Sequence, residues 1–189
     1  MSETARVLSV SVALARTVPW RGQAVRTGIY KAPTDRRVRV RRLGLDGDEQ
    51  ADLEVHGGPL KAVYAYPSEH YPFWRKELPG ASLPWGAFGE NLTVSGLSED
   101  RVRVEDRFRI GTAVVAVTKP RFPCYKLGIK FGREDIIERF LASGRTGFYL
   151  RVLEEGELAA GDDIEILGGG EGQPTIADLV ATRQTAGEA

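Results

Sequence analysis

The chain has 189 residues, of which 42% are hydrophobic, so it is long enough to form one domain with an ordinary buried core and too apolar to be disordered throughout. Its 26 Lys and Arg residues balance 26 Asp and Glu residues, which excludes an overall positive field that would recruit nucleic acid or an anionic membrane. A single cysteine excludes an internal disulfide, and two histidines are few for a zinc site built by the protein alone.

The amino-terminal run "RVLSVSVAL", residues 6–14, alternates apolar residues with serine and arginine. It is too short to cross a bilayer and lacks the long charged start of a signal peptide, so we interpret it as a strand. Together with the single cysteine, this favours a soluble protein of the reducing cytoplasm.

Further alternating or β-branched runs occur at residues 36–43, 91–94, 101–111, 112–119, 147–154 and 162–167. Their period of two predicts a mainly β fold. Because closure removes the exposed edges of a sheet made of short strands, we expect a β-barrel with a few peripheral helices. The helical patterns lie at residues 69–78, 133–144 and 175–183.

The end of the chain differs from the rest in composition. A glycine-rich stretch begins at residue 168 and leads into the last, short helical pattern and a polar end. We therefore expect a barrel domain over residues 1–167, and over residues 168–189 a linker with a short helical tail that is mobile or incomplete as a unit.

Residues 44–66 interrupt the strand pattern and are rich in glycine and carboxylates, which is typical of a long functional loop. Within it, "DGDEQAD" has the spacing of the first ligands of a calcium loop. Ala51 and Gly57, however, stand where such a loop needs a turn glycine and a bidentate glutamate. We therefore interpret the acidic stretch as solvated or salt-bridged.

The stretch "HGGPLK", residues 56–61, follows in the same loop. Its glycines would let backbone amides approach a phosphate beside Lys61, although the spacing is not that of a nucleotide-binding P-loop, and a tight turn is the simpler interpretation. His56 is either a turn residue that forms a backbone hydrogen bond or a functional acid, base or ligand. No H-E-x-x-H or C-x-x-C spacing supplies companions for a zinc ion.

Cys124 lies in "KPRFPCYKLG", residues 119–128, directly after an apolar run. Pro120 and Pro123 end the strand pattern before it. The stretch also contains cations that would favour a thiolate if they lie close to the sulfur: Lys119, Arg121 and Lys126. The residues alone leave a reactive or metal-binding thiolate and a structural cysteine as equal alternatives.

A Cys–His hydrolase is a further alternative. Cys124 could pair with His56 or with His70, because such partners meet only in the fold. No local family signature accompanies the cysteine.

Four blocks in one order cover much of residues 44–156: "GLDGDEQADLEVHGGPLKAVYAYPSEHY", "FGENLTVSGL", "KPRFPCYKL" and "SGRTGFYLRVLEEG". Together they resemble the MOSC domain, named after the molybdenum cofactor sulfurase C-terminal domain, and within it the small YiiM-like branch. The resemblance implies a MOSC-type β-barrel, like that of pyruvate kinase, which binds molybdenum cofactor (molybdopterin). It also implies that Cys124 is the protein ligand to molybdenum. We do not expect pyridoxal phosphate as a cofactor.

Members of this branch reduce N-hydroxylated compounds, such as hydroxylaminopurines, to amines. The resemblance therefore implies a small-molecule N-hydroxylated substrate and a separate flavin or iron–sulfur protein as electron donor, with no nucleic acid and no membrane, and it allows a homodimer. Around the catalytic Cys124, the residues that we expect to bind the cofactor are His56, Gly57, Lys61, Asn91, Arg121, Lys126 and Arg145.

Two other functions stay open. The same fold could store or carry molybdenum cofactor or sulfur without reductase turnover, and the second alternative is the Cys–His hydrolase. Branch members usually continue past the barrel into a small helical domain, whereas only a short tail follows here.

Overall fold

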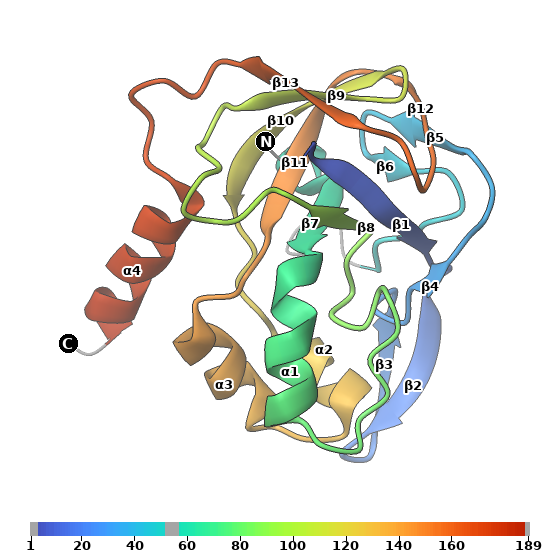
Figure 1. The fold of residues 1–189 in the computed structure, drawn as a ribbon. Coiled ribbons are helices and arrows are strands. Elements are labelled where there is room, and N and C mark those ends of the chain that lie inside the picture. The colour runs from blue at the N-terminus through green and yellow to red at the C-terminus, as the bar shows by residue number, and fades with distance from the viewer. Residues whose placement is uncertain (1–3, 52–56, 188–189) are drawn as a thin grey trace.

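The structure is a computed structural model that describes residues 4–51 and 57–187. A strongly curved eight-stranded sheet forms its frame, in the order β13-β9-β10-β11-β7-β8-β1-β4 (Figure 1). Neighbouring strands are antiparallel, except that β7 and β8 are parallel. The strands are β1 (Arg6–Val12), β4 (Ala32–Pro33), β7 (Val63–Pro67), β8 (Leu92–Ser95), β9 (Arg107–Ile110), β10 (Ala113–Pro120), β11 (Phe148–Glu154) and β13 (Ile164–Gly168).

Smaller elements complete the described part of the chain. A three-stranded sheet joins β12 (Gly156–Leu158), β5 (Val38–Arg41) and β6 (Gly44–Leu45), and a separate hairpin joins β2 (Arg16–Trp20) to β3 (Gln23–Thr27). The helices are the 3-10 turns η1 (Pro59–Lys61) and η2 (Ser68–His70), and the α-helices α1 (Tyr71–Glu77), α2 (Tyr125–Phe131), α3 (Ile136–Ser143) and α4 (Ile176–Gly187).

The mainly β character predicted from the sequence is confirmed, as are the three helical patterns. The interpretation of residues 44–66 as a loop is wrong for β7, which lies inside the sheet. Every residue of β7 is buried, so this strand has no polar face and no alternation to reveal it. The hairpin and helix α2 were not predicted either.

The expected closed barrel is not found in the described residues. The sheet curls until β1 meets the segment before β13, where Arg6 and Asp163 form an isolated bridge. Backbone hydrogen bonds from Val7 N to Asp162 O (2.9 Å) and from Ile164 N to Ala5 O (2.8 Å) support this contact. Because the segment before β13 is a turn, these bonds join the two sides of the sheet without forming a continuous ladder.

Two apolar cores lie on this frame. The first is enclosed by the curved sheet and is made mainly of valine, leucine and isoleucine. The second is aromatic and lies among β7 and helices α1, α2 and α3, which gather on one side of the sheet (Figure 1). In it, Trp74 stacks on Phe140 and donates its indole N–H to the hydroxyl of Tyr66 at 2.7 Å. The aromatic rings therefore fix the helices against the sheet.

The carboxy-terminal tail packs on the domain. Ile176 and Val180 of α4 are buried in the sheet core, and Ile176 N donates to Val102 O at 2.9 Å. At the other end of α4, the Gln184 amide donates to Leu141 O at 2.7 Å. The tail thus makes more contact with the domain than its glycine-rich approach suggests.

Among the described residues, none of the helices has both the length and the apolar composition needed to cross a membrane.

Candidate functional site

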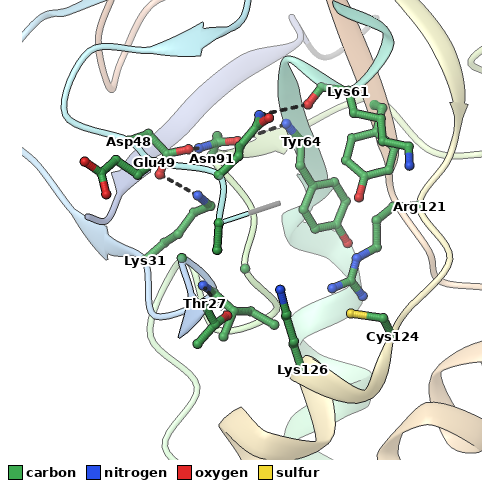
Figure 2. Close-up of a pocket in the computed structure, with 16 residues that line it drawn as sticks. Thr27, Lys31, Asp48, Glu49, Lys61, Tyr64, Asn91, Arg121, Cys124 and Lys126 are labelled. Atoms are coloured by element: carbon green, nitrogen blue, oxygen red, sulfur yellow. Dashed lines mark hydrogen bonds and ion pairs between the residues drawn. The ribbon is translucent and has the colours of Figure 1, made fainter. Parts of the chain in front are cut away.

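A cavity opens where the end of β10, the start of α2, β7 and the loops around residues 28 and 49 come together (Figure 2). It brings together five of the residues proposed from the sequence, although they come from three separate segments of the chain: Lys61, Asn91, Arg121, Cys124 and Lys126. Its other lining residues are Thr27, Gly28, Ile29, Lys31, Asp48, Glu49, Gln50, Ala51, Tyr64, Gly89 and Tyr149.

Cys124 is placed by the way in which strand β10 ends. The strand stops at Pro120, and the chain then crosses to α2, where Cys124 is the extended residue that precedes the helix. Leu127 N donates to Cys124 O at 2.9 Å, which holds the turn into the helix. The side chain of Cys124 is half-buried, and Figure 2 shows its sulfur on the cavity side, beside the guanidinium of Arg121.

Arg121 is the most deeply buried cation of the cavity, with 5% of its surface exposed. Its guanidinium lies 5.2 Å from the ring centre of Tyr64 and 5.4 Å from that of Phe140, so aromatic faces partly replace its water. Burial alone would lower the pKa of Arg121, but Tyr64, Tyr149 and Cys124 raise it above its ordinary value. Arg121 therefore keeps its positive charge next to the thiol.

Two polar atoms of the lining are buried without a hydrogen-bond partner among the described residues. They are Nη1 of Arg121, which is a donor, and Oε1 of Gln50, which is an acceptor. Such groups cost free energy unless a ligand or water pairs with them. The cavity therefore fits a ligand that carries negative charge and also offers hydrogen-bond donors, as the anionic molybdenum cofactor with its pterin does.

The opposite wall is held by a buried ion pair. Lys31 and Asp48 are in contact, and their side chains are 9% and 1% exposed. Burial lowers the pKa of Lys31, and the neighbouring Asp48 opposes that change. The second oxygen of Asp48 accepts the amide N–H of Asn91 at 3.0 Å. This wall is therefore a preformed network.

The side-chain amide of Asn91 forms three hydrogen bonds within that network. Besides Asp48, it donates to Ser11 O at 3.3 Å, and its Oδ1 accepts the backbone N–H of Tyr64 at 3.1 Å. The structure thus places Asn91 at the cavity, with its amide between β7 and the acidic loop, where it positions both.

Two tyrosines form an apolar face of the cavity. The rings of Tyr64 and Tyr149 lie 5.5 Å apart, and the hydroxyl of Tyr64 donates to Thr146 O at 2.8 Å. Burial raises the pKa of both phenols, so both stay protonated at neutral pH. They offer flat apolar surface to a planar ligand.

Two further predicted residues that the structure describes do not line the cavity. Gly57 is half-buried and is not among the described lining, and His56 lies outside the described residues. Arg145 does not line the cavity, because its guanidinium lies 4.0 Å from the ring centre of Phe73 and donates to Ser143 O. The glycine pair of "HGGPLK" leads into η1 with Gly58 at a φ of 86°, which confirms the tight turn.

The structure does not bring His70 to Cys124. His70 is absent from the cavity lining, and its Nε2 lies 2.7 Å from Glu99 Oε2. The acidic loop is salt-bridged, since Asp46 pairs with Arg41 and Glu49 with Arg26. Over residues 4–51 and 57–187, no group of three or more His, Cys, Asp and Glu side chains could hold a metal ion.

Sequence reasoning missed several lining residues, notably Lys31, Tyr64 and Tyr149. Lys31 follows an isolated hairpin, and the tyrosines belong to buried strands, where aromatic residues are ordinarily core. The one available signal was the concentration of tyrosines in "AVYAY", directly after "HGGPLK".

The model of the MOSC domain family matches residues 52–165. Protein YflK of Bacillus subtilis (strain 168) is 48% identical over 87% of this chain, which spans 74% of YflK. Protein YiiM of Escherichia coli (strain K12) is 40% identical over 75% of this chain, which spans 64% of that protein. A protein of Gibberella moniliformis named "Reductase" is 37% identical over 77% of this chain, which spans only 26% of its length.

The fold is also that of a solved structure. The crystal structure of YiiM from Geobacillus stearothermophilus superimposes with a TM-score of 0.80 at 32% identity, over 98% of this chain and 86% of that one. The similarity therefore extends over the sheet, the helices and the tail.

Proposed function

We propose, on the premise that this chain belongs to the MOSC domain family, that it is a molybdenum-cofactor-dependent reductase which converts N-hydroxylated compounds, such as hydroxylaminopurine-like substrates, to amines. The observation that carries the proposal is the pairing in one cavity of the Cys124 thiol with the buried, incompletely paired guanidinium of Arg121. A soft sulfur ligand beside a fixed cation suits an anionic thiolate-bound metal group.

Several side chains of the cavity have a task in this proposal. Cys124 supplies sulfur to the metal, and Arg121, Lys61 and Lys126 bind the anionic parts of the cofactor. The Lys31–Asp48 pair, held by Asn91, keeps the far wall in place. When bound, the cofactor supplies a metal that can accept the oxygen of an N–OH group with a two-electron change.

The proposed chemistry asks little acid–base work of the protein. Tyr64 and Tyr149 stay neutral and exclude water from one side of the cavity. Arg121 cannot give up its proton at physiological pH, so it acts by charge and by hydrogen bonding. These residues bind and orient, while the cofactor carries out the redox step.

Electrons are proposed to come from a separate flavin or iron–sulfur protein. The relative named "Reductase" supports a redox role, and it is much longer than this chain. The same proposal includes three further points. The partly closed sheet serves as a MOSC-type barrel, the protein acts as a homodimer, and it is located in the cytoplasm.

The decisive experiment compares the wild type with Cys124→Ser, both purified from a host that makes molybdopterin. We expect molybdenum and pterin to copurify with the wild type, and a chemical electron donor to support reduction of an N-hydroxylated purine. Cys124→Ser should lose the metal and the activity. Tyr125→Phe is the matched control, because Tyr125 neighbours the cysteine but does not line the cavity.

The alternatives give different results. A carrier would hold the cofactor in the wild type without reducing the substrate. A well-folded wild type that contains neither molybdenum nor pterin would contradict the whole proposal.

A further inference from the structure

A second cavity lies at the base of the β2–β3 hairpin, between the hairpin, the loop around Pro84 and the end of α2. It is distinct from the Cys124 cavity, although Lys31 lines both. Its described lining is Arg16, Tyr30, Lys31, Ser82, Pro84, Ala87, Lys130 and Phe131.

Two cations without a carboxylate partner in the described chain, Arg16 and Lys130, line this cavity beside Lys31, whose ammonium is paired with Asp48. The described lining contains no carboxylate. Arg16 is exposed and lies 3.8 Å from the ring centre of Tyr30, which fixes the guanidinium as a flat donor surface. Lys130 donates to Ile29 O at 3.0 Å and to Gly86 O at 2.6 Å. An ammonium has three N–H donors, so these two bonds leave one for a ligand.

The nearest carboxylates are already engaged, and Asp48 is engaged in part by Lys31 itself. Asp48 accepts from Lys31, from Asn91 and from the backbone N–H of Ala13. Glu90 is fully buried and accepts the N–H groups of residues 86 and 88, besides the hydroxyls of residues 71 and 93. Arg16 forms no ion pair with a carboxylate of the described chain.

The neighbouring positive charges affect the pKa of Lys130. Burial, together with the charges of Lys31, Arg121 and Arg16, lowers the pKa of Lys130 to about 8, against the opposing effect of Glu90. Like charges held together in this way are stabilised by an anion that binds among them.

We propose that this second cavity binds the phosphate group of a small phosphomonoester. A phosphomonoester has terminal oxygens and two negative charges, which match the guanidinium of Arg16 and the remaining N–H of Lys130, two donors that come from different elements. The rings of Tyr30 and Phe131 line the remaining wall and would contact the organic part of the ligand. This site is independent of the metal chemistry at Cys124.

The test is calorimetric titration of inorganic phosphate into protein made without molybdopterin, at low ionic strength, with sodium chloride and acetate as comparison salts. We expect phosphate to bind saturably, and acetate to bind with an affinity at least tenfold lower. Arg16→Gln, an exposed and structurally mild change, should weaken phosphate binding about tenfold. Lys126→Gln, which removes a cation from the Cys124 cavity, should leave this binding unchanged.

Other outcomes overturn the proposal. Absence of saturable binding would do so, as would binding that Arg16→Gln leaves intact. Loss of binding in Lys126→Gln would place the anion in the Cys124 cavity instead. The Arg36→Gln variant controls for the loss of one exposed positive charge, because Arg36 lies outside both cavities.

Discussion

The guanidinium of Arg121 is buried beside the thiol of Cys124, and its Nη1 has no hydrogen-bond partner among the described residues. A buried, incompletely paired cation is costly to fold. It is retained at the one cysteine of the chain, where a negatively charged ligand would pair with it.

Replacement of Arg121 by methionine should separate binding from stability. Without cofactor, the free energy of unfolding of the variant should equal that of the wild type or exceed it by up to about 2 kcal/mol. The reason is that a buried charge is exchanged for an apolar side chain of similar length. Its molybdenum and pterin content should fall at least tenfold. Chemical denaturation and metal analysis check this, with Arg183→Met as the control. A large loss of stability would show that Arg121 is mainly structural.

Replacement of Asp48 by asparagine should be destabilising by about 3 kcal/mol. The change leaves Lys31 buried without its counter-ion and weakens the contact with Asn91. Glu49→Gln is the control, since its pair with Arg26 is exposed and should contribute less than about 1 kcal/mol. Urea unfolding measures both variants. Equal effects would indicate that the Lys31–Asp48 pair has no special role.

Because of Lys130, the free energy of unfolding should depend on pH above neutrality. Its pKa is about 8 in the folded chain against 10.5 in the unfolded chain, so the unfolded state binds more protons between these values. Stability therefore rises with pH in this window. The free energy of unfolding of the wild type relative to Lys130→Met should increase by roughly 1 kcal/mol per pH unit between pH 8 and pH 9.5. A constant difference across that range would contradict the assignment.

Replacement of Ile176 by alanine should be destabilising by about 2–4 kcal/mol, because it opens a cavity where α4 enters the sheet core. Thr182→Ala, on the exposed side of the same helix, should change stability by less than about 1 kcal/mol. A single cooperative unfolding transition in both variants would show that the tail unfolds with the domain. Near-neutral behaviour of Ile176→Ala would show that it does not.

The sequence predicted strands such as β5 and β9, in which buried and exposed residues alternate, and it missed β7, whose residues are all buried, and the largely exposed β2–β3 hairpin. It also identified Cys124, Arg121, Lys126, Lys61 and Asn91, which meet in one cavity. That agreement rests on ordered motifs, since spacing alone left the cysteine undecided.

The remaining site residues depend on tertiary contacts. Lys31 reaches Asp48, which lies 17 residues further along the chain, and the position of Arg145 over Phe73 follows from packing against α1. Neither contact has a local pattern in the sequence. The incomplete closure of the sheet likewise depends on the turn before β13, where β1 forms only an isolated bridge, and periodicity does not describe it.

The Cys124 cavity lies on the seam between the two apolar cores. Arg121 follows a strand that contributes to the sheet core, and its guanidinium lies over Phe140 of the aromatic core. Because the aromatic core itself joins β7 to the helices, a shift of the helices against the sheet would disturb that core as well as the cavity. The width of the Cys124 cavity is therefore set in part by the packing of rings that do not line it.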